Sequence, residues 1–365
     1  MASAPHLEMV AGAFRASAHV YAQMGSPLYA EFCRLGESDL EVLSLADFGM
    51  DGAKPSHLFS SVHYLLLGNP DDPLARYFAT LCEEPLPPVG AYADFARYCR
   101  KHRATLQELL QTRTVQTTYA ERCRALLAPM CEVARMADEP LNLIEIGCSA
   151  GVLLVFDKFA YKLDEQGVIG SADAAFLLEG ELNGGPELFI PRIGTRTGID
   201  LHTIDVSSEE ERRWLLALCF PELRAEQQRL DQALDVIAAS DVTMLEGDAL
   251  MHIDQALADA PDPVCVFHSA CLFYWPKQAK QALEDRLLEA SRGRDIWRIG
   301  IEPSDTFDEW HKGRIGEEED EAQARQRSGE IAITRYRGGE AQRRVVGRPN
   351  ADYGKTDWLG SETVA

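Results

Sequence analysis

Residues 143–151 read LIEIGCSAG and determine the expected fold. A short apolar run, interrupted only by Glu145, leads into a turn of small residues between Gly147 and Gly151. Glycine allows backbone conformations and close approaches that other residues do not. A buried strand that enters a helix through such a turn is a common layout for holding a nucleotide-like ligand. The stretch therefore predicts the first strand of an α/β domain with a ligand at its end.

The sequence around this stretch alternates between strand-like and helical segments from residue 138 onward. A helix is expected over 150–163, directly after the first strand. Further strands are expected within 197–201, 241–246, 263–268 and 295–303, and a hairpin at 330–347 turns at Gly338 and Gly339. Residues 171–192 read as an inserted hairpin that turns at Asn183–Gly185. Strands that alternate with helices predict a mainly parallel, Rossmann-like sheet, which the last hairpin closes with antiparallel strands.

The first 137 residues have helical periodicity instead. Apolar residues recur at helical spacing over 6–24, 55–67, 92–110 and 117–137, and Asp138-Glu139-Pro140 then interrupts the pattern. We therefore expect an all-helical domain over 1–137 and an α/β domain over 138–365. The helices could form a lid, a substrate wall or a dimer surface, so a homo-oligomer remains one of the options.

Charge and composition exclude several classes of partner. The net charge of −22 disfavours nucleic acid and anionic membrane surfaces, and no stretch approaches the ~20 apolar residues of a spanning helix. Nine cysteines without a C-x-x-C pair predict reduced thiols in a cytoplasmic protein. No His or Cys spacing predicts a metal site. A small-molecule substrate is the partner that remains.

The glycine turn distinguishes two classes of cofactor. A dinucleotide fingerprint, G-x-G-x-x-G, would begin at Gly147 and fails at Ser149 and Val152. The pattern E-x-G-x-G-x-G resembles motif I of the class I S-adenosylmethionine-dependent methyltransferases. Glu145, Gly147 and Gly151 match it, and Ser149 replaces the middle glycine. The resemblance implies a Rossmann-like methyltransferase-type fold, in which Glu145 meets the cationic amino group of the methionine moiety and the bare turn leaves room for the ribose.

Two later strand ends supply acidic residues in the order that this resemblance implies. Asp200 would bind the ribose hydroxyls, or Glu179 or Glu181 would do so if 171–192 is not an insertion. Asp248 and Ala249 would contact the adenine. Structural roles are the alternatives, because Asp200 can cap a turn and Asp248 can cap the next helix.

The fourth strand ends in VFHSACLFYW, which adds candidate catalytic residues. Ligands of open parallel sheets bind at the carboxyl ends of the strands, so His268, Ser269 and Tyr274 are expected near the cleft, with Glu302 on the same edge. Because its pKa is ordinarily near neutrality, His268 is the first candidate for a general base and also for a cofactor contact. A structural histidine is the alternative.

Most of the chain from about Ser26 also resembles a bacterial family of unknown function whose second half is methyltransferase-like. The motifs that carry this resemblance are VQTTYAERCRALLAP, EIGCSAGVLLVFDKFAYKL, RTGIDLHTIDV, RRWLLALCFPE, EGDAL and VFHSACLFYW. The chain departs from the family's Q-T-N-E at Gln116–Tyr119, and from its His-Gly pair at Tyr353-Gly354. The resemblance implies S-adenosylmethionine-dependent methyl transfer to a small acceptor, without naming that acceptor.

Two other functions fit the same residues. Residues 147–151 also match the G-x-S-x-G elbow of a serine hydrolase. Ser149 would then be the nucleophile, and Asp248 with His268 or His311 would complete a triad. The third option is a protein that binds a nucleoside through this fold without catalysis.

Overall fold

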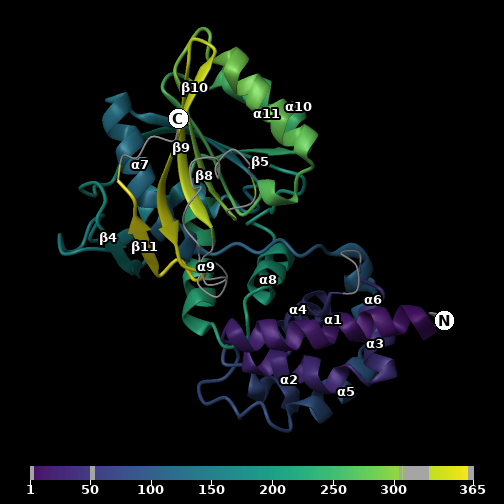
Figure 1. Cartoon of the computed structure of the whole chain (residues 1–365). Coiled ribbons are helices and arrows are strands. Elements are labelled where there is room, and N and C mark those ends of the chain that lie inside the picture. Colours follow the sequence, from purple (N-terminus) through teal and green to yellow (C-terminus); the bar gives the residue numbers. More distant parts are fainter. Residues whose placement is uncertain (1–3, 50–53, 304–305, 307–328, 361–365) are drawn as a thin grey trace, which may run out of the picture. The chain divides into compact units, whose positions relative to one another are not determined.

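The computed structural model describes residues 4–49, 54–303, 306 and 329–360. The chain divides into two compact units (Figure 1). One comprises Met1–Thr118 and Ser207–Asp231, and the other comprises Tyr119–Val206 and Gln232–Ala365. This division differs from the expected boundary at residue 137. Residues 119–137 belong to the α/β unit, and residues 207–231 return to the helical one.

The first unit consists of helices around an aromatic core. They are α1 (Ala4–Gln23), α2 (Pro27–Gly36), α3 (Leu40–Ala46), α4 (Pro55–Gly68), η1 (Pro73–Tyr77), α5 (Ala91–Lys101), α6 (Arg103–Thr112), α8 (Glu209–Ala217) and the start of α9 (Arg224–Ala238). The rings of Phe32 and Phe95 stack with centroids 4.2 Å apart. The single helix expected over 92–110 is two helices, because the backbone leaves the helical region at His102 (φ −107°, ψ 20°).

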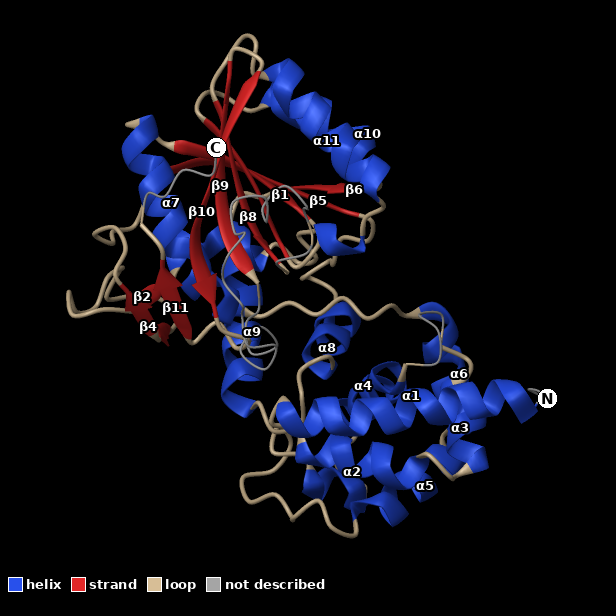
Figure 2. Cartoon of the chain, in the orientation of Figure 1, coloured by secondary structure: helices blue, strands red, loops and turns tan. Residues whose placement is uncertain are grey.

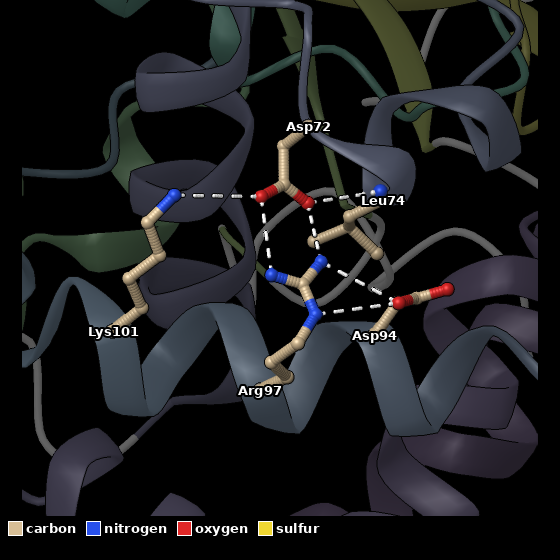
Figure 3. Close-up of polar contacts among 5 residues, drawn as sticks. All are labelled: Asp72, Leu74, Asp94, Arg97 and Lys101. Carbon is tan, nitrogen blue, oxygen red and sulfur yellow. Dashed lines mark hydrogen bonds and ion pairs between the residues drawn. The ribbon is translucent and has the colours of Figure 1, made fainter.

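A polar cluster fixes the connection between α4 and α5 within this unit (Figure 3). Asp72 accepts hydrogen bonds from Leu74 N (3.1 Å) and from both terminal nitrogens of Arg97 (2.6 and 3.2 Å), and Lys101 lies 3.8 Å away. Burial opposes ionisation, but the bonds from Arg97 and Leu74 prevail and lower the pKa of Asp72. Asp72 therefore ties the start of η1 to α5.

The second unit contains a nine-stranded sheet in the order β4-β11-β10-β9-β8-β7-β1-β5-β6 among the described residues. The five neighbouring strands from β8 to the edge strand β6 (β8, β7, β1, β5 and β6) are parallel, and β9 and β10 add the antiparallel hairpin expected at Gly338–Gly339. The bounds are β1 (Leu141–Ile146), β4 (Glu181–Asn183), β5 (Ile193–Asp200), β6 (Thr243–Glu246), β7 (Val264–Ser269), β8 (Ile296–Glu302), β9 (Glu330–Arg337), β10 (Glu340–Pro349) and β11 (Lys355–Trp358). The expected mixed α/β architecture with a helical N-terminal region is confirmed.

The strand order reverses between β1 and β7. From β1 the chain proceeds to β5 and β6 on one side, and then returns to β7 and β8 on the other. In open parallel sheets the loops at such a reversal leave the sheet in opposite directions, which makes the carboxyl ends of the two strands the usual place for a ligand. The loops after β1 and β7 are therefore the relevant ones here.

Helices pack on both faces of this sheet (Figure 2). Helices α10 (Ala249–Asp259) and α11 (Lys277–Ala290) share a buried apolar cluster with Ile144, Ile146 and Val266. On the other face, Met130 of α7 (Cys123–Ala137) meets Cys265 of β7. Because side chains alternate along a strand, Glu145 faces the α7 side.

Two expectations for residues 150–192 are wrong. The α-helix expected over 150–163 does not form. Instead, η3 (Val152–Lys158) is a short 3-10 segment with a kink at Val155, followed by β2 (Ala160–Lys162). Val152–Phe156 are buried throughout, so their apolar run has no exposed face to set a helical period.

The expected hairpin at 171–192 is absent as well. Strand β3 (Leu177–Glu179) pairs with β2, whereas β4 pairs with β11, and only Gly180 separates β3 from β4. One residue is too short to reverse the chain. Residues 186–192 contain Pro186 and Pro191, which lack the N–H that a strand needs, and they form no strand.

Candidate functional site

The turn after β1 adopts the strained conformations that its small residues suggested. Gly147, Ser149 and Gly151 all have positive φ (76°, 52° and 80°). Ser149 is the exceptional one, because residues with a Cβ rarely occupy this region. Gly147 N donates to Ile199 O (2.8 Å), and this bond joins the turn to β5.

Asp200, at the end of β5, holds the same turn with its side chain. Its Oδ2 accepts from Ser149 N (2.8 Å), and its Oδ1 accepts from His202 N (3.1 Å). A carboxylate that accepts backbone N–H bonds can impose a conformation that the chain would otherwise avoid. Asp200 thus lies next to the turn, as predicted, and the structure gives it a positioning role there.

Three buried polar atoms near the ends of β1 and β7 have no hydrogen-bond partner among the described residues. They are Glu145 Oε2, Ser149 Oγ and Ser269 Oγ, in side chains that are at most 6% exposed. Glu145 pairs with Phe267 in the parallel register, so Ser269 lies two residues further along the same face of the sheet. Because buried polar groups are normally satisfied by protein or water, this concentration at one end of two adjacent strands indicates a place for a polar ligand.

Arg122, from η2 (Ala120–Arg122), approaches these groups from the α7 side. Its guanidinium donates to Ser269 O (3.3 Å). Burial raises the pKa of Glu145 well above its ordinary range. The positive charge of Arg122 opposes this rise, and Asp200 adds to it. Glu145 is therefore a buried carboxyl with a raised pKa, and a further cation beside it would lower that pKa.

The turn after β7 packs directly against the turn after β1. A Cβ on Gly147 would lie 2.7 Å from Cys271 Cβ and closer still to its Sγ, so Cys271 fills the space that the missing side chain leaves. Glu302, at the end of β8, accepts from Cys271 N (3.1 Å), Leu272 N (3.0 Å) and Phe273 N (3.4 Å). Gly147 is required here by protein packing, and the room that we expected it to leave for a ribose holds Cys271 instead.

His268 is the fourth donor to Glu302, since its Nδ1 lies 2.7 Å from the Oε1 atom. Glu302 already accepts backbone N–H bonds, so it also acts as the acceptor toward His268. We therefore place the proton of His268 on Nδ1. Burial lowers the pKa of His268, although the bond to Glu302 opposes this change. The side chain is fully buried, and its geometry is that of a residue that positions Glu302. Its catalytic role stays a prediction.

The end of β6 is organised differently from the ends of β1 and β5. Asp248 is exposed and caps α10 by accepting from Leu250 N (2.8 Å), and Ala249 is buried in the cluster beneath that helix. Glu246, which pairs with Asp200 in the register of β5 and β6, accepts from Thr203 N (3.2 Å). The adenine contact of Asp248 and Ala249 stays a prediction, whereas the helix-capping alternative for Asp248 is confirmed.

The remaining candidate residues are exposed or lie outside the described residues. Glu179 and Glu181 are exposed and pair with Lys162 and Lys355 respectively, outside the five neighbouring parallel strands from β8 to β6. Tyr274 is exposed in the turn after β7. His311 lies outside the described residues.

Sequence reasoning missed the contributions of Arg122 and Cys271. Arg122 precedes β1 by about a helix length, and no spacing rule connects a residue before a strand with the carboxyl end of that strand. Cys271 looked like one apolar cysteine among nine. The only signal for Cys271 in the sequence is Gly147, whose position leaves no room for a Cβ. The sequence alone does not show which residue fills that space.

Among the described residues, no group of three or more His, Cys, Asp or Glu side chains could hold a metal ion. No described helix is long and apolar enough to cross a bilayer.

These features define an α/β protein with a central parallel sheet and a buried polar site where its strand order reverses. Comparison with protein families assigns the chain. Residues 11–356 match the family described as "Uncharacterized protein conserved in bacteria (DUF2332)", and the chain belongs to that family. The search of curated proteins finds no match.

Proposed function

We propose that the α/β unit binds S-adenosylmethionine at the carboxyl ends of β1, β5 and β7 and transfers its methyl group to a small-molecule acceptor. The observation that carries this proposal is the buried, unpartnered Oε2 of Glu145 beside a turn with three positive φ angles. The reversal of strand order between β1 and β7 supports the same location.

The available groups suit the amino-acid end of such a ligand. Glu145 would lose its proton and accept from the ammonium group, because a nearby cation favours the charged carboxylate. Ser149 Oγ and Ser269 Oγ have unused hydrogen-bonding capacity for the ligand's polar atoms. Asp200 would act mainly by holding the turn, since Ser149 N and His202 N already donate to it.

When bound, the sulfonium supplies an electrophilic methyl group. Glu145, Ser149 and Ser269 would hold the ligand's amino-acid end, and the bound group would supply the methyl carbon to the acceptor and leave as a neutral thioether. The protein contributes orientation and exclusion of water, which are the main sources of rate in such an in-line displacement.

Isothermal titration of the full chain with S-adenosylhomocysteine tests the proposal. We expect binding to the wild type and a rise in melting temperature. Glu145→Gln should weaken binding about tenfold or more, the usual cost of removing a charged hydrogen-bond partner. Glu187→Gln is the matched control, because that side chain is 80% exposed. Absence of heat with the wild type, or equal affinity in Glu145→Gln, would refute the proposal. Binding without methyl transfer to any acceptor in a cell extract would support the non-catalytic function instead.

A serine hydrolase is the second candidate, and the positive φ of Ser149 in the GCSAG turn favours it. Activation would require a base at Ser149 Oγ, but no described residue hydrogen-bonds to that atom. Labelling by a fluorophosphonate probe that disappears in Ser149→Ala would establish the hydrolase. An unlabelled wild type would eliminate it.

A further inference from the structure

Arg124, the second residue of α7, is a partly buried arginine whose charge is not neutralised. Its Nε atom is buried without a hydrogen-bond partner, and none of the described residues forms a hydrogen bond or an ion pair with its guanidinium group. Two other described arginines, Arg76 and Arg192, also lack such a partner, but both are exposed to solvent. Because a guanidinium group withdrawn from water normally has an acceptor, Arg124 has the capacity to bind one from a ligand.

The surroundings of Arg124 leave its positive charge uncompensated. Its Cδ atom lies 3.3 Å from the position that a Cβ on Gly180 would take, and Gly354 O lies 2.7 Å from the same position. The two acidic residues that flank Gly180, Glu179 and Glu181, each form an ion pair with a lysine, at 3.4 and 3.7 Å. The acidic charges beside Gly180 are therefore balanced, and the charge of Arg124 is not.

Arg124 lies at the sheet edge that carries the proposed cofactor site. Strand β9 begins opposite the end of β8, and β10 and β11 follow in alternating directions, so Gly354 and the start of β11 lie at that edge. Arg122, two residues before Arg124, donates to Ser269 O at the end of β7. The segment that carries Arg124 therefore also reaches the buried polar site.

The turn that precedes β11 is held rigidly beside Gly180. Tyr353 has a positive φ of 57°, and Asn350 fixes the turn by accepting from Tyr353 N (3.1 Å) with its carbonyl oxygen and from Lys355 N (2.9 Å) with its Oδ1. A residue with a Cβ persists in this conformation only where the surrounding structure imposes it, and such positions are frequent at binding sites. The backbone next to Arg124 is thus fixed before any ligand binds.

We infer that Arg124 binds an anionic group of the methyl acceptor, and that the acceptor is a small molecule with a carboxylate or a phosphate. This inference rests on the proposed function for the meaning of "acceptor". A guanidinium group matches the geometry of both anions through two parallel N–H bonds. The net charge of −22 repels anions at long range, so the acceptor needs a cation at close range, which Arg124 supplies.

Isothermal titration of the full chain with acetate and, separately, with inorganic phosphate tests the inference at an ionic strength fixed with sodium chloride. We expect the wild type to bind at least one of the two anions. Arg124→Met, which keeps the length of the side chain without its charge, should weaken that binding about tenfold or more. Preference for acetate would identify the acceptor as a carboxylate, and preference for phosphate would identify it as a phosphate.

Arg192→Met is the matched control, because it removes the same charge from an exposed arginine that also lacks a partner. It should bind the anion as tightly as the wild type. Arg124→Lys serves as a second variant in case Arg124→Met disturbs the fold, and it should bind more weakly than the wild type because lysine cannot donate two parallel bonds. No binding of either anion to the wild type, undiminished binding in both Arg124 variants, or an equally large loss in Arg192→Met would overturn the inference.

Titration of Arg124→Met with S-adenosylhomocysteine separates this inference from the proposed function. Unchanged S-adenosylhomocysteine affinity with lost anion binding supports both. Wild-type binding of S-adenosylhomocysteine without binding of either anion removes only the anionic acceptor. Anion binding that depends on Arg124, with no S-adenosylhomocysteine binding to the wild type, would refute the cofactor and leave an anion site. Loss of S-adenosylhomocysteine binding in folded Arg124→Met would overturn the assignment of Arg124 to the acceptor.

Discussion

Replacement of Glu145 by glutamine should stabilise the protein, and the gain should grow with pH. Glu145 is 2% exposed and burial raises its pKa, so the folded protein retains a proton that the unfolded chain releases above pH ~4.3. The folded state then binds more protons than the unfolded state. The free energy of unfolding consequently falls as pH rises, by up to ~1.4 kcal/mol per pH unit, until the folded-state pKa is reached.

Glutamine has nearly the same shape and no proton to lose, so it avoids this penalty. Urea unfolding between pH 4 and 8 should show a difference between Glu145→Gln and the wild type that is small at the acidic end. The difference should then increase by about 1.4 kcal/mol for each pH unit up to the folded-state pKa. Glu187→Gln, at an exposed position, should show no such trend. A Glu145→Gln variant that is less stable than the wild type at neutral pH would refute the reasoning, because it would mean that Glu145 is ionised and paired in the folded state.

Three further substitutions probe the supports of the site and of the helical unit. Gly147→Ala should destabilise the protein by about 2 kcal/mol or more, since alanine would be strained at the positive φ of this position and would clash with Cys271. Adding Cys271→Gly should recover part of this loss, as measured by thermal unfolding. Glu302→Gln should cost about 2–4 kcal/mol, because it removes the negative charge from a buried carboxylate that accepts three backbone N–H bonds, and urea unfolding at neutral pH measures this. Asp72→Asn should lower the free energy of unfolding by about 1–3 kcal/mol above pH 4, while Asp71→Asn, at an exposed position, should leave it unchanged. A loss of stability in Asp72→Asn that is equally large at pH 2 would contradict the ionic role of Asp72.

The sequence predicted those elements whose patterning reflects burial. The strands around Leu143 and Phe267 are largely apolar and buried because helices cover both faces of the sheet. The closing hairpin was recognisable because Gly338–Gly339 supplies the positive φ that a tight turn requires. Such signals lie within a few consecutive residues, so they can be recognised in the sequence.

The errors came from segments in which local pattern and tertiary packing conflict. Val152–Phe156 is buried on every side, so its apolar residues did not reveal a 3-10 conformation. The pairing of β4 with β11 joins segments about 170 residues apart, and nothing local indicates it.

The residues of the candidate site also divide into those that local patterns identified and those that only the assembled sheet brings together. Glu145, Ser149 and Asp200 were identified from the turn and from the order of the strand ends; Ser149 N donates to Asp200, and the charge of Asp200 helps to raise the pKa of Glu145. The contact of Cys271 with Gly147 and the anchoring of its turn by Glu302 depend on strand adjacency, which the sequence specifies only through the whole sheet.

A crystal structure of the full chain with S-adenosylhomocysteine would test the central claim most directly. We predict that the ligand's amino nitrogen lies within hydrogen-bonding distance of Glu145 Oε2, with its amino-acid portion beside Ser149. Density for the ligand at any other location, or for a water that alone satisfies Glu145 Oε2 at saturating ligand, would contradict the claim.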